Sequence, residues 1–93
     1  MTQALISILQ ERDKQIHTKG YQQEQDDSYM YGELSMAASC YALHSGVNSG
    51  CVPVNWPFDD IFWKPKSRRE NLVRAAALLL AEIESLDRRG GTQ

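Results

Sequence analysis

The sequence has no long apolar run, few cysteines and histidines, and only a small net charge. No stretch reaches the roughly 20 consecutive apolar residues that span a bilayer. The opening MTQALISILQERDK lacks the cationic start and the small-residue cleavage site of a secretory signal. These absences predict a cytoplasmic protein that does not contact a membrane.

Cysteine and histidine are too sparse to predict a metal site. The chain has two of each, and Cys40, Cys51, His17 and His44 do not show the paired spacing of a zinc site or of a disulfide framework. We therefore expect two free thiols and no bound metal. Ten basic against twelve acidic side chains give a formal net charge of -2, which does not favour binding to DNA.

The length suits one helical domain, residues 1–93, with a modest core. A chain of this size buries only about 60–65% of its unfolded surface, so association between copies would help it. Hydrophobic periodicity predicts helices over about 2–19, 29–44 and 68–88, with an aromatic loop over about 45–66. The predicted fold class is all-α, with three main helices assembled as a homo-oligomer.

Apolar positions at three- and four-residue spacing mark the expected core face of each helix. The first helix carries Leu5, Ile6, Leu9 and Ile16, and the second carries Leu34, Ala37, Ala38, Tyr41 and Ala42. The third follows a capping box, SRRE, and its main stripe is Leu72, Ala76, Leu79, Ile83 and Leu86. Further apolar residues widen that stripe beyond one core face, so we expect self-association through the third helix, with the second as the other candidate.

Aromatic and basic side chains are concentrated in one segment, WPFDDIFWKPKSRRE, residues 56–70. Prolines before and within it exclude a long helix or a central strand. Five cations against one acid give residues 64–74 a formal charge of +4, whereas six acids against three bases give residues 11–33 a formal charge of -3. The molecule is therefore electrically polarised despite its small net charge.

The aromatic and basic segment has the chemistry that a nucleotide requires. Four cations surround the start of the third helix, where free amides and the helix dipole favour an anion: Lys64, Lys66, Arg68 and Arg69. Trp56 and Trp63 offer flat faces on which a base could stack. The alternatives are tryptophans that close the core and arginines that are solvated. Because the dipole disfavours cations at a helix start, an anionic ligand or acids of a neighbouring subunit are expected beside them.

Several motifs along the chain resemble those of a family of small tailed-phage and prophage proteins. The matching stretches are ERDKQI, GYQQEQDD, GELSMAASCYA and WPFDDIFWKPKSRRENLVRAAALLLAEIESLDRR, which together cover nearly the whole chain. Members of the family are sometimes labelled as similar to dATP/dGTP pyrophosphohydrolases or to all-α MazG-type enzymes. The resemblance implies a phage origin, with two possible roles: nucleotide hydrolysis, or sequestration of a nucleotide signal of bacterial immunity.

An enzyme of the MazG type holds Mg²⁺ with several carboxylates on facing helices. Glu84 and Asp87 have the three-residue spacing that places two carboxylates on one helix face, and Glu33 stands in the second helix. Met36 and Ala37 follow at the positions where a second carboxylate of that helix is required. Magnesium catalysis by Glu33, Glu84 and Asp87 is therefore the alternative hypothesis, and solvated surface acids are the plain explanation.

The leading hypothesis is a phage-encoded homo-oligomer that binds a nucleotide-derived signalling molecule in the infected bacterial cell without turning it over. It requires no cofactor and no catalytic residue. The predicted ligand-binding residues are Trp56, Trp63, Lys64, Lys66, Arg68, Arg69, Tyr21 and Glu33. Tyr21 is included because tyrosine suits subunit boundaries, and Glu33 because the neighbouring Gly32 allows a close approach. A third hypothesis is that the same loop binds a host protein.

Overall fold

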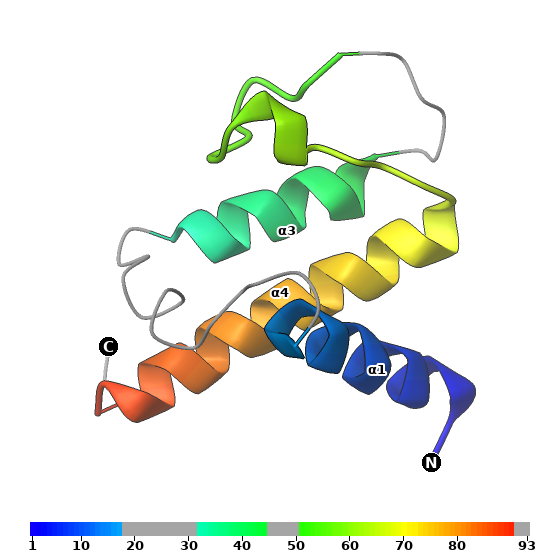
Figure 1. The fold of residues 1–93 in the computed structure, drawn as a ribbon, viewed down its shortest axis with the longest axis vertical. Coiled ribbons are helices and arrows are strands. Elements are labelled where there is room, and N and C mark those ends of the chain that lie inside the picture. Colours follow the sequence, from blue (N-terminus) through cyan, green and yellow to red (C-terminus); the bar gives the residue numbers. More distant parts are fainter. Residues whose placement is uncertain (18–31, 45–50, 91–93) are drawn as a thin grey trace.

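A computed structural model describes residues 1–17, 32–44 and 51–90, which form three α-helices and one 3₁₀ turn and contain no strand (Figure 1). The elements are α1 (Gln3–His17), α3 (Glu33–Leu43), η1 (Asp60–Phe62) and α4 (Arg68–Arg88). The all-α class is confirmed. No helix of the described ranges is both long enough and apolar enough to cross a bilayer.

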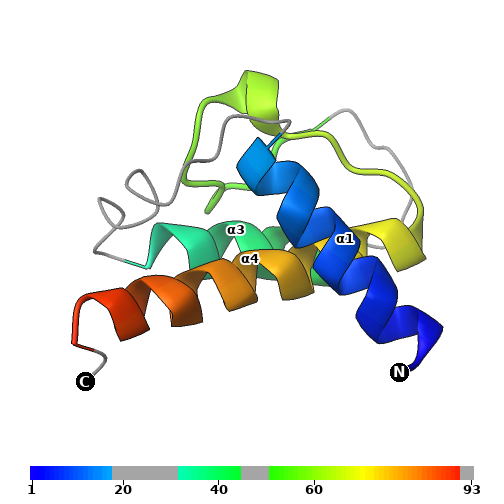
Figure 2. The ribbon, with the colours of Figure 1, turned by 60° about the horizontal axis from the view of Figure 1, so that its bottom comes forward.

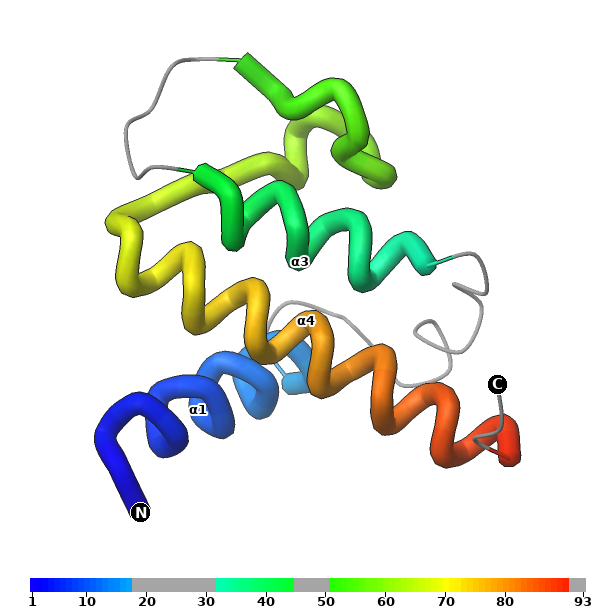
Figure 3. Tube along the Cα trace, turned by 180° about the vertical axis from the view of Figure 1, so that it is seen from behind, coloured from blue at the N-terminus to red at the C-terminus, as the bar shows by residue number. Residues whose placement is uncertain are grey.

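Helix α4 lies between the other two helices (Figures 1 and 3). It packs against α3 on one side and α1 on the other, and the segment 51–66 passes over α3. Because Ser35 bonds Glu82 whereas Ala42 bonds Arg68, α3 and α4 run antiparallel. Figure 2 shows this pair side by side, with α1 crossing α4.

The apolar core is built mainly from small side chains at the contact of α3 and α4. Its members are Leu34, Ala37, Ala38, Tyr41, Ala75, Leu78 and Ala81, each no more than 6% exposed. Four of these seven are alanines, which let two helix backbones approach closely. The predicted core positions of the second helix are confirmed at Leu34, Ala37, Ala38 and Tyr41, and Ala42 is half-buried.

The predicted core stripe of the third helix is wrong at three of its five positions, and its other two members, Ala76 and Leu86, are half-buried. Leu72, Leu79 and Ile83 are 43%, 45% and 55% exposed, whereas the smaller Ala75, Ala77 and Ala81 on other faces are buried. Close helix contact at alanines leaves no space between the helices for the leucine stripe. Part of the wide apolar surface of this helix is covered within the chain, because α1 packs on the face opposite α3.

Helix α1 also differs from the prediction in which of its side chains are buried. Leu5 and Leu9 are 45% and 44% exposed, and the buried side chains are polar: Glu11, Arg12 and Gln15. Arg12 Nε donates to Glu84 Oε1 of α4 at 2.9 Å, and Gln15 Nε2 donates to Glu11 at 3.5 Å. The hydrogen-bonded ion pair of Arg12 with Glu84 therefore contributes to the docking of α1 on α4, whereas the bond from Gln15 to Glu11 lies within α1.

Both ends of α3 are capped by side chains of α4. The residue before α3 is Gly32, in the left-handed region with φ of 82°, and it has no side chain to cap the helix. Glu82 instead accepts hydrogen bonds from the backbone N–H of Ser35 at 3.0 Å and from its hydroxyl at 2.6 Å. At the other end Arg68 donates to the carbonyls of Ala42 and His44, the latter at 2.8 Å. Each charge has the sign that the dipole of α3 favours.

The capping box predicted for α4 is present. Ser67 is the N-cap, and its hydroxyl oxygen accepts from the Glu70 N–H at 3.2 Å. The same hydroxyl donates to the Glu70 carboxylate at 2.8 Å. Helix α4 accordingly begins at Arg68.

Candidate functional site

The structure separates the predicted ligand residues into distinct places. Trp56 and Trp63 lie in an aromatic cluster on α3, whereas Lys66 and Arg69 line a cavity between α1 and α4. Arg68 belongs to neither group, because it caps α3. Lys64 and Glu33 also lie apart from the cavity, and Tyr21 lies outside the described residues.

The aromatic cluster is centred on Tyr41, which is 6% exposed. Trp63 stacks on the Tyr41 ring with centroids 4.8 Å apart and planes inclined by 28°. Trp56 meets Tyr41 and Trp63 edge-on at 5.5 Å and 5.0 Å, and it meets Phe58 edge-on at 5.6 Å. These distances lie in the range preferred by packed aromatic pairs.

Hydrogen bonds fix the segment that carries the tryptophans. Trp56 Nε1 donates to the carbonyl of Asp59 at 3.1 Å, and the N–H of Lys64 donates to the Tyr41 hydroxyl at 3.4 Å. Both tryptophans are half-buried against the core. At least one face of Trp63 is therefore used in packing, which agrees with the alternative that these side chains close the core.

The cavity lies between the N-terminal part of α4 and the middle of α1, and its volume is about 200 Å³. Its lining is more polar than apolar. The charged residues around it are Glu11, Lys14, Lys66, Arg69, Glu70 and Arg74. Four positive side chains against two negative ones leave a formal charge of +2 within a protein whose net charge is -2.

The two carboxylates of the cavity have partners on their own segments. Glu11 lies 4.0 Å from the Lys14 ammonium and is 9% exposed. The hydrogen bond from the Ser67 hydroxyl lowers the pKa of Glu70, and the charges of Lys66 and Arg74 act in the same direction. A lowered pKa means that Glu70 stays ionised at neutral pH, so its negative charge belongs to the electrostatics of the cavity.

Two cations of the α4 side, Arg69 and Arg74, donate to neutral acceptors. Arg69 Nη2 donates to Ser7 Oγ of α1 at 3.2 Å, and Arg74 Nη1 donates to the carbonyl of Lys64. Within residues 1–17, 32–44 and 51–90, Lys66, Arg69 and Arg74 make no ion pair. Each retains N–H groups and a full positive charge, which is the chemistry that recognises a phosphate or carboxylate.

Arg74 connects the cavity to the aromatic cluster. Its guanidinium carbon stands 5.5 Å from the centre of the Tyr41 ring, within the distance of a cation–π contact. The same side chain lines the cavity and bonds Lys64 in the segment between the cluster and α4. An anion in the cavity would therefore contact a side chain that also touches the ring on which Trp63 stacks.

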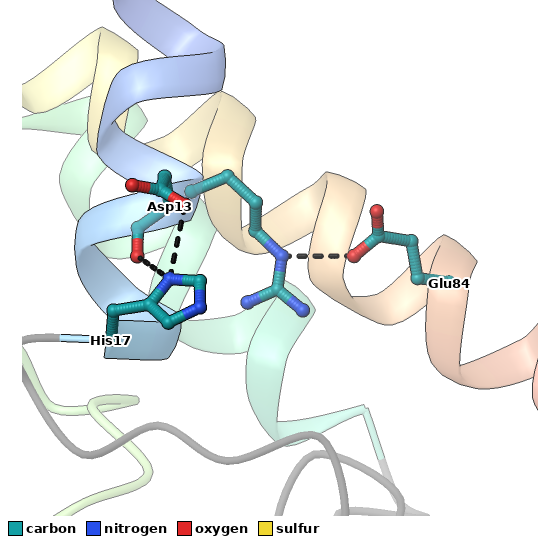
Figure 4. Close-up of polar contacts among 4 residues, drawn as sticks. Asp13, His17 and Glu84 are labelled. Atoms are coloured by element: carbon teal, nitrogen blue, oxygen red, sulfur yellow. Dashed lines mark hydrogen bonds and ion pairs between the residues drawn. The ribbon is translucent and has the colours of Figure 1, made fainter.

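The carboxylates of the alternative magnesium site are not brought together. Glu84 accepts from Arg12 (Figure 4), Glu33 begins α3, and Asp87 is exposed near the end of α4. Among the described residues, no three of histidine, cysteine, aspartate and glutamate are close enough to hold a metal ion. The described part of one chain therefore does not bring Glu33, Glu84 and Asp87 together as a metal site.

One cation at the start of α4 is explained by a contact that the sequence did not predict. Neither a ligand nor a neighbouring subunit is needed to explain Arg68, because the carbonyls at the end of α3 stand beside it. Sequence reasoning also missed Lys14 and Ser7 of α1 as neighbours of the basic segment. Their signal is a polar helix face, since Ser7, Glu11 and Lys14 recur at four- and three-residue spacing.

Comparisons with protein-family models, with curated protein sequences and with solved structures found no match to this chain.

Proposed function

We propose that the protein binds a phosphorylated, nucleotide-derived small molecule without turning it over, with a phosphate group of the ligand in the cavity between α1 and α4. The observation that carries this proposal is the set of four cations around one small cavity: Lys14, Lys66, Arg69 and Arg74. Lys66 and Arg69 belong to the phosphate contacts predicted from sequence. Arg68, Trp56 and Trp63 have structural contacts that account for them, and we leave them out of the revised site.

The size of the cavity limits what enters it. Sites for whole small molecules measure about 300–1,000 Å³, and this cavity measures about 200 Å³. It suits a phosphate or diphosphate group, with the nucleoside part outside. Arginine is suited to this role because its planar guanidinium can give two parallel hydrogen bonds to one phosphate.

The biological role that we propose is sequestration of a nucleotide signal of bacterial anti-phage immunity. Its support is the resemblance of the sequence motifs to small phage proteins, together with a basic cavity suited to phosphate. A protein that acts stoichiometrically requires a dissociation constant near nanomolar, equivalent to about -12 kcal/mol. Several charge-assisted hydrogen bonds of about 1.5–3 kcal/mol each could supply much of that affinity.

The test is calorimetric titration of the purified protein with pyrophosphate, nucleoside triphosphates and cyclic dinucleotides, followed by native mass spectrometry of retained ligand. The informative variant is Lys66→Ala with Arg69→Ala. Loss of two charge-assisted contacts should weaken binding by about 3 kcal/mol, or about a hundredfold. Raised salt should weaken wild-type binding as well.

The matched control is Lys64→Ala, which removes an exposed cation near the cavity that does not line it. Its affinity should equal that of the wild type. Equal weakening by the control and by the double variant would refute the cavity as the phosphate site. Release of a monophosphate or pyrophosphate from a bound nucleotide would refute binding without turnover.

A further inference from the structure

An exposed apolar surface covers one side of the α3/α4 pair, away from the cavity. It comprises Met36 and Leu43 of α3 with Leu72, Leu79 and Ile83 of α4, whose exposed fractions run from 40% to 82%. On α4 these residues continue one stripe with Ala76, so the stripe has no charged member from residue 72 to residue 83. Five large apolar side chains of this pair thus lie outside, whereas the buried contact is made mainly by alanines together with Leu34, Leu78 and Tyr41.

Met36 and Leu43 of α3 lie on the same side of the α3/α4 pair as the apolar stripe of α4. Met36 directly follows Ser35, and Ile83 directly follows Glu82, the two residues whose hydrogen bond joins the helices. Each step along an α-helix turns the side chain by about 100° in one sense. Because α3 and α4 run antiparallel, that turn carries Met36 and Ile83 to one common side of the pair. Leu43 follows Met36 by two turns, and Leu72 and Leu79 precede Ile83 at helical spacing, so they share this side.

We propose that this surface, the α3/α4 outer face, binds a second copy of the chain about a two-fold axis near Leu79, with the two α4 helices antiparallel. A two-fold contact places a surface against itself, so any charge on the axis would meet the same charge. The stripe has none. The inference does not depend on the proposed ligand, because none of Met36, Leu43, Leu72, Leu79 and Ile83 lines the cavity. Arg69, at the edge of the α3/α4 outer face, also lines the cavity, so the dimer is tested by variants at other residues.

Charges at the edge of the α3/α4 outer face match this arrangement. Arg69 and Asp87 are 18 residues apart, which is five turns at 3.6 residues per turn, so both lie on the same flank of the stripe. Their midpoint is residue 78, beside Leu79. In the two-fold dimer Arg69 of each subunit lies next to Asp87 of the partner subunit, which gives two equivalent ion pairs. Within the described part of the chain, Asp87 is exposed and has no ion pair.

The test is sedimentation velocity and light scattering of the full chain over a wide range of concentrations. We expect a mass of twice 10.5 kDa. Leu79→Glu places like charges across the axis and should give a single-chain mass with an unchanged helical far-UV spectrum. Ile61→Glu is the matched control, because Ile61 is 69% exposed in η1 and outside this face; it should remain dimeric.

A second variant keeps the test decisive if Leu79→Glu fails to fold. Asp87→Arg changes an exposed side chain near the end of α4 and should raise the dimer dissociation constant about tenfold, whereas Asp87→Glu should leave it unchanged. A single-chain mass for the wild type at every concentration would overturn the proposal. A dimer unaffected by Leu79→Glu and Asp87→Arg would also overturn it. Leu79→Glu leaves the cavity between α1 and α4 intact. Pyrophosphate titration of the folded variant therefore distinguishes failure of the dimer proposal from failure of the ligand site.

Discussion

Helix α4 has two partners, and it meets them with different chemistry. Toward α3 it presents alanines and Leu78, all buried, with Glu82 and Arg68 bonded to the two ends of the partner helix. Toward α1 it presents Glu84, which pairs with Arg12, and it leaves a charged cavity of about 200 Å³. Tight apolar packing excludes a ligand, whereas a polar contact with an unfilled cavity can accept one. The comparison assigns stability mainly to the α3 side and binding to the α1 side.

The largest effect is expected where a buried side chain of the α3/α4 contact is shortened. Leu34 is 1% exposed, so Leu34→Ala should lower the free energy of unfolding by about 3 kcal/mol through lost burial and an unfilled hole. Urea denaturation followed by circular dichroism measures this. Ile8→Ala, at a half-buried position of α1, is the matched control and should cost about 1 kcal/mol. Equal losses would contradict the assignment of stability to the α3 side.

Next in expected size is the ion pair that joins α1 to α4. Arg12 is 4% exposed and Glu84 is partly exposed, so Arg12→Ala should cost about 2 kcal/mol. Removing Glu84 as well should recover part of that loss, because the carboxylate left without Arg12 is then also gone. Thermal unfolding of both single variants and the double variant gives the coupling energy. A coupling near zero would mean that the ion pair does not hold α1.

The caps of α3 should have smaller effects. Glu82→Ala leaves the Ser35 N–H without its acceptor and should cost about 1.5 kcal/mol. Arg68→Ala removes donors from two carbonyls and should cost about 1 kcal/mol. Pyrophosphate affinity should be unchanged in Arg68→Ala, which separates this arginine from Arg69. A loss of affinity there would return Arg68 to the binding site.

The smallest effect concerns the pKa of Glu70. Its pKa is lowered mainly by the Ser67 hydroxyl, so Ser67→Ala should raise it toward the ordinary value of about 4.3, and Ser67→Thr should keep it low. Because the folded pKa is depressed, the stability from this group is present above the ordinary pKa and disappears as pH falls through the folded pKa. NMR titration of the carboxyl carbon checks the pKa. An unchanged value in Ser67→Ala would exclude the hydroxyl as its cause.

Sequence patterns identified the helices more reliably than they identified what each helix buries. Ser67 and Glu70 mark the start of α4 because a capping box is a local signal, and its hydrogen bonds lie within four residues. The interior of α4 was misassigned because Leu72, Leu79 and Ile83 form a regular stripe that is indistinguishable by period from a core face. The alanines at the contact between α3 and α4 contribute little to a hydrophobic pattern because their side chains are small, although they determine how closely the helices approach.

Only part of the candidate site could be predicted from the sequence, because its residues come from two distant segments. Lys66 and Arg69 lie in the basic segment, whose composition is visible in the sequence, and both line the cavity. Lys14 comes from α1, more than 50 positions earlier, and only the crossing of α1 over α4 brings it there. Arg68 looked like its neighbour Arg69 in the sequence, yet one step of about 100° turns it to the end of α3 instead.

The paired caps on α3 also determine how the two helices align along their length. Alanine surfaces are smooth, and on their own they permit a helix to pack at positions shifted by one turn of about 5.4 Å. Glu82 and Arg68 are 14 residues apart, or about 21 Å along α4, and the 11-residue α3 is about 16 Å long. A one-turn slip in either direction would move both charges away from the helix ends that they stabilise. The caps therefore select a single alignment that the alanines do not specify.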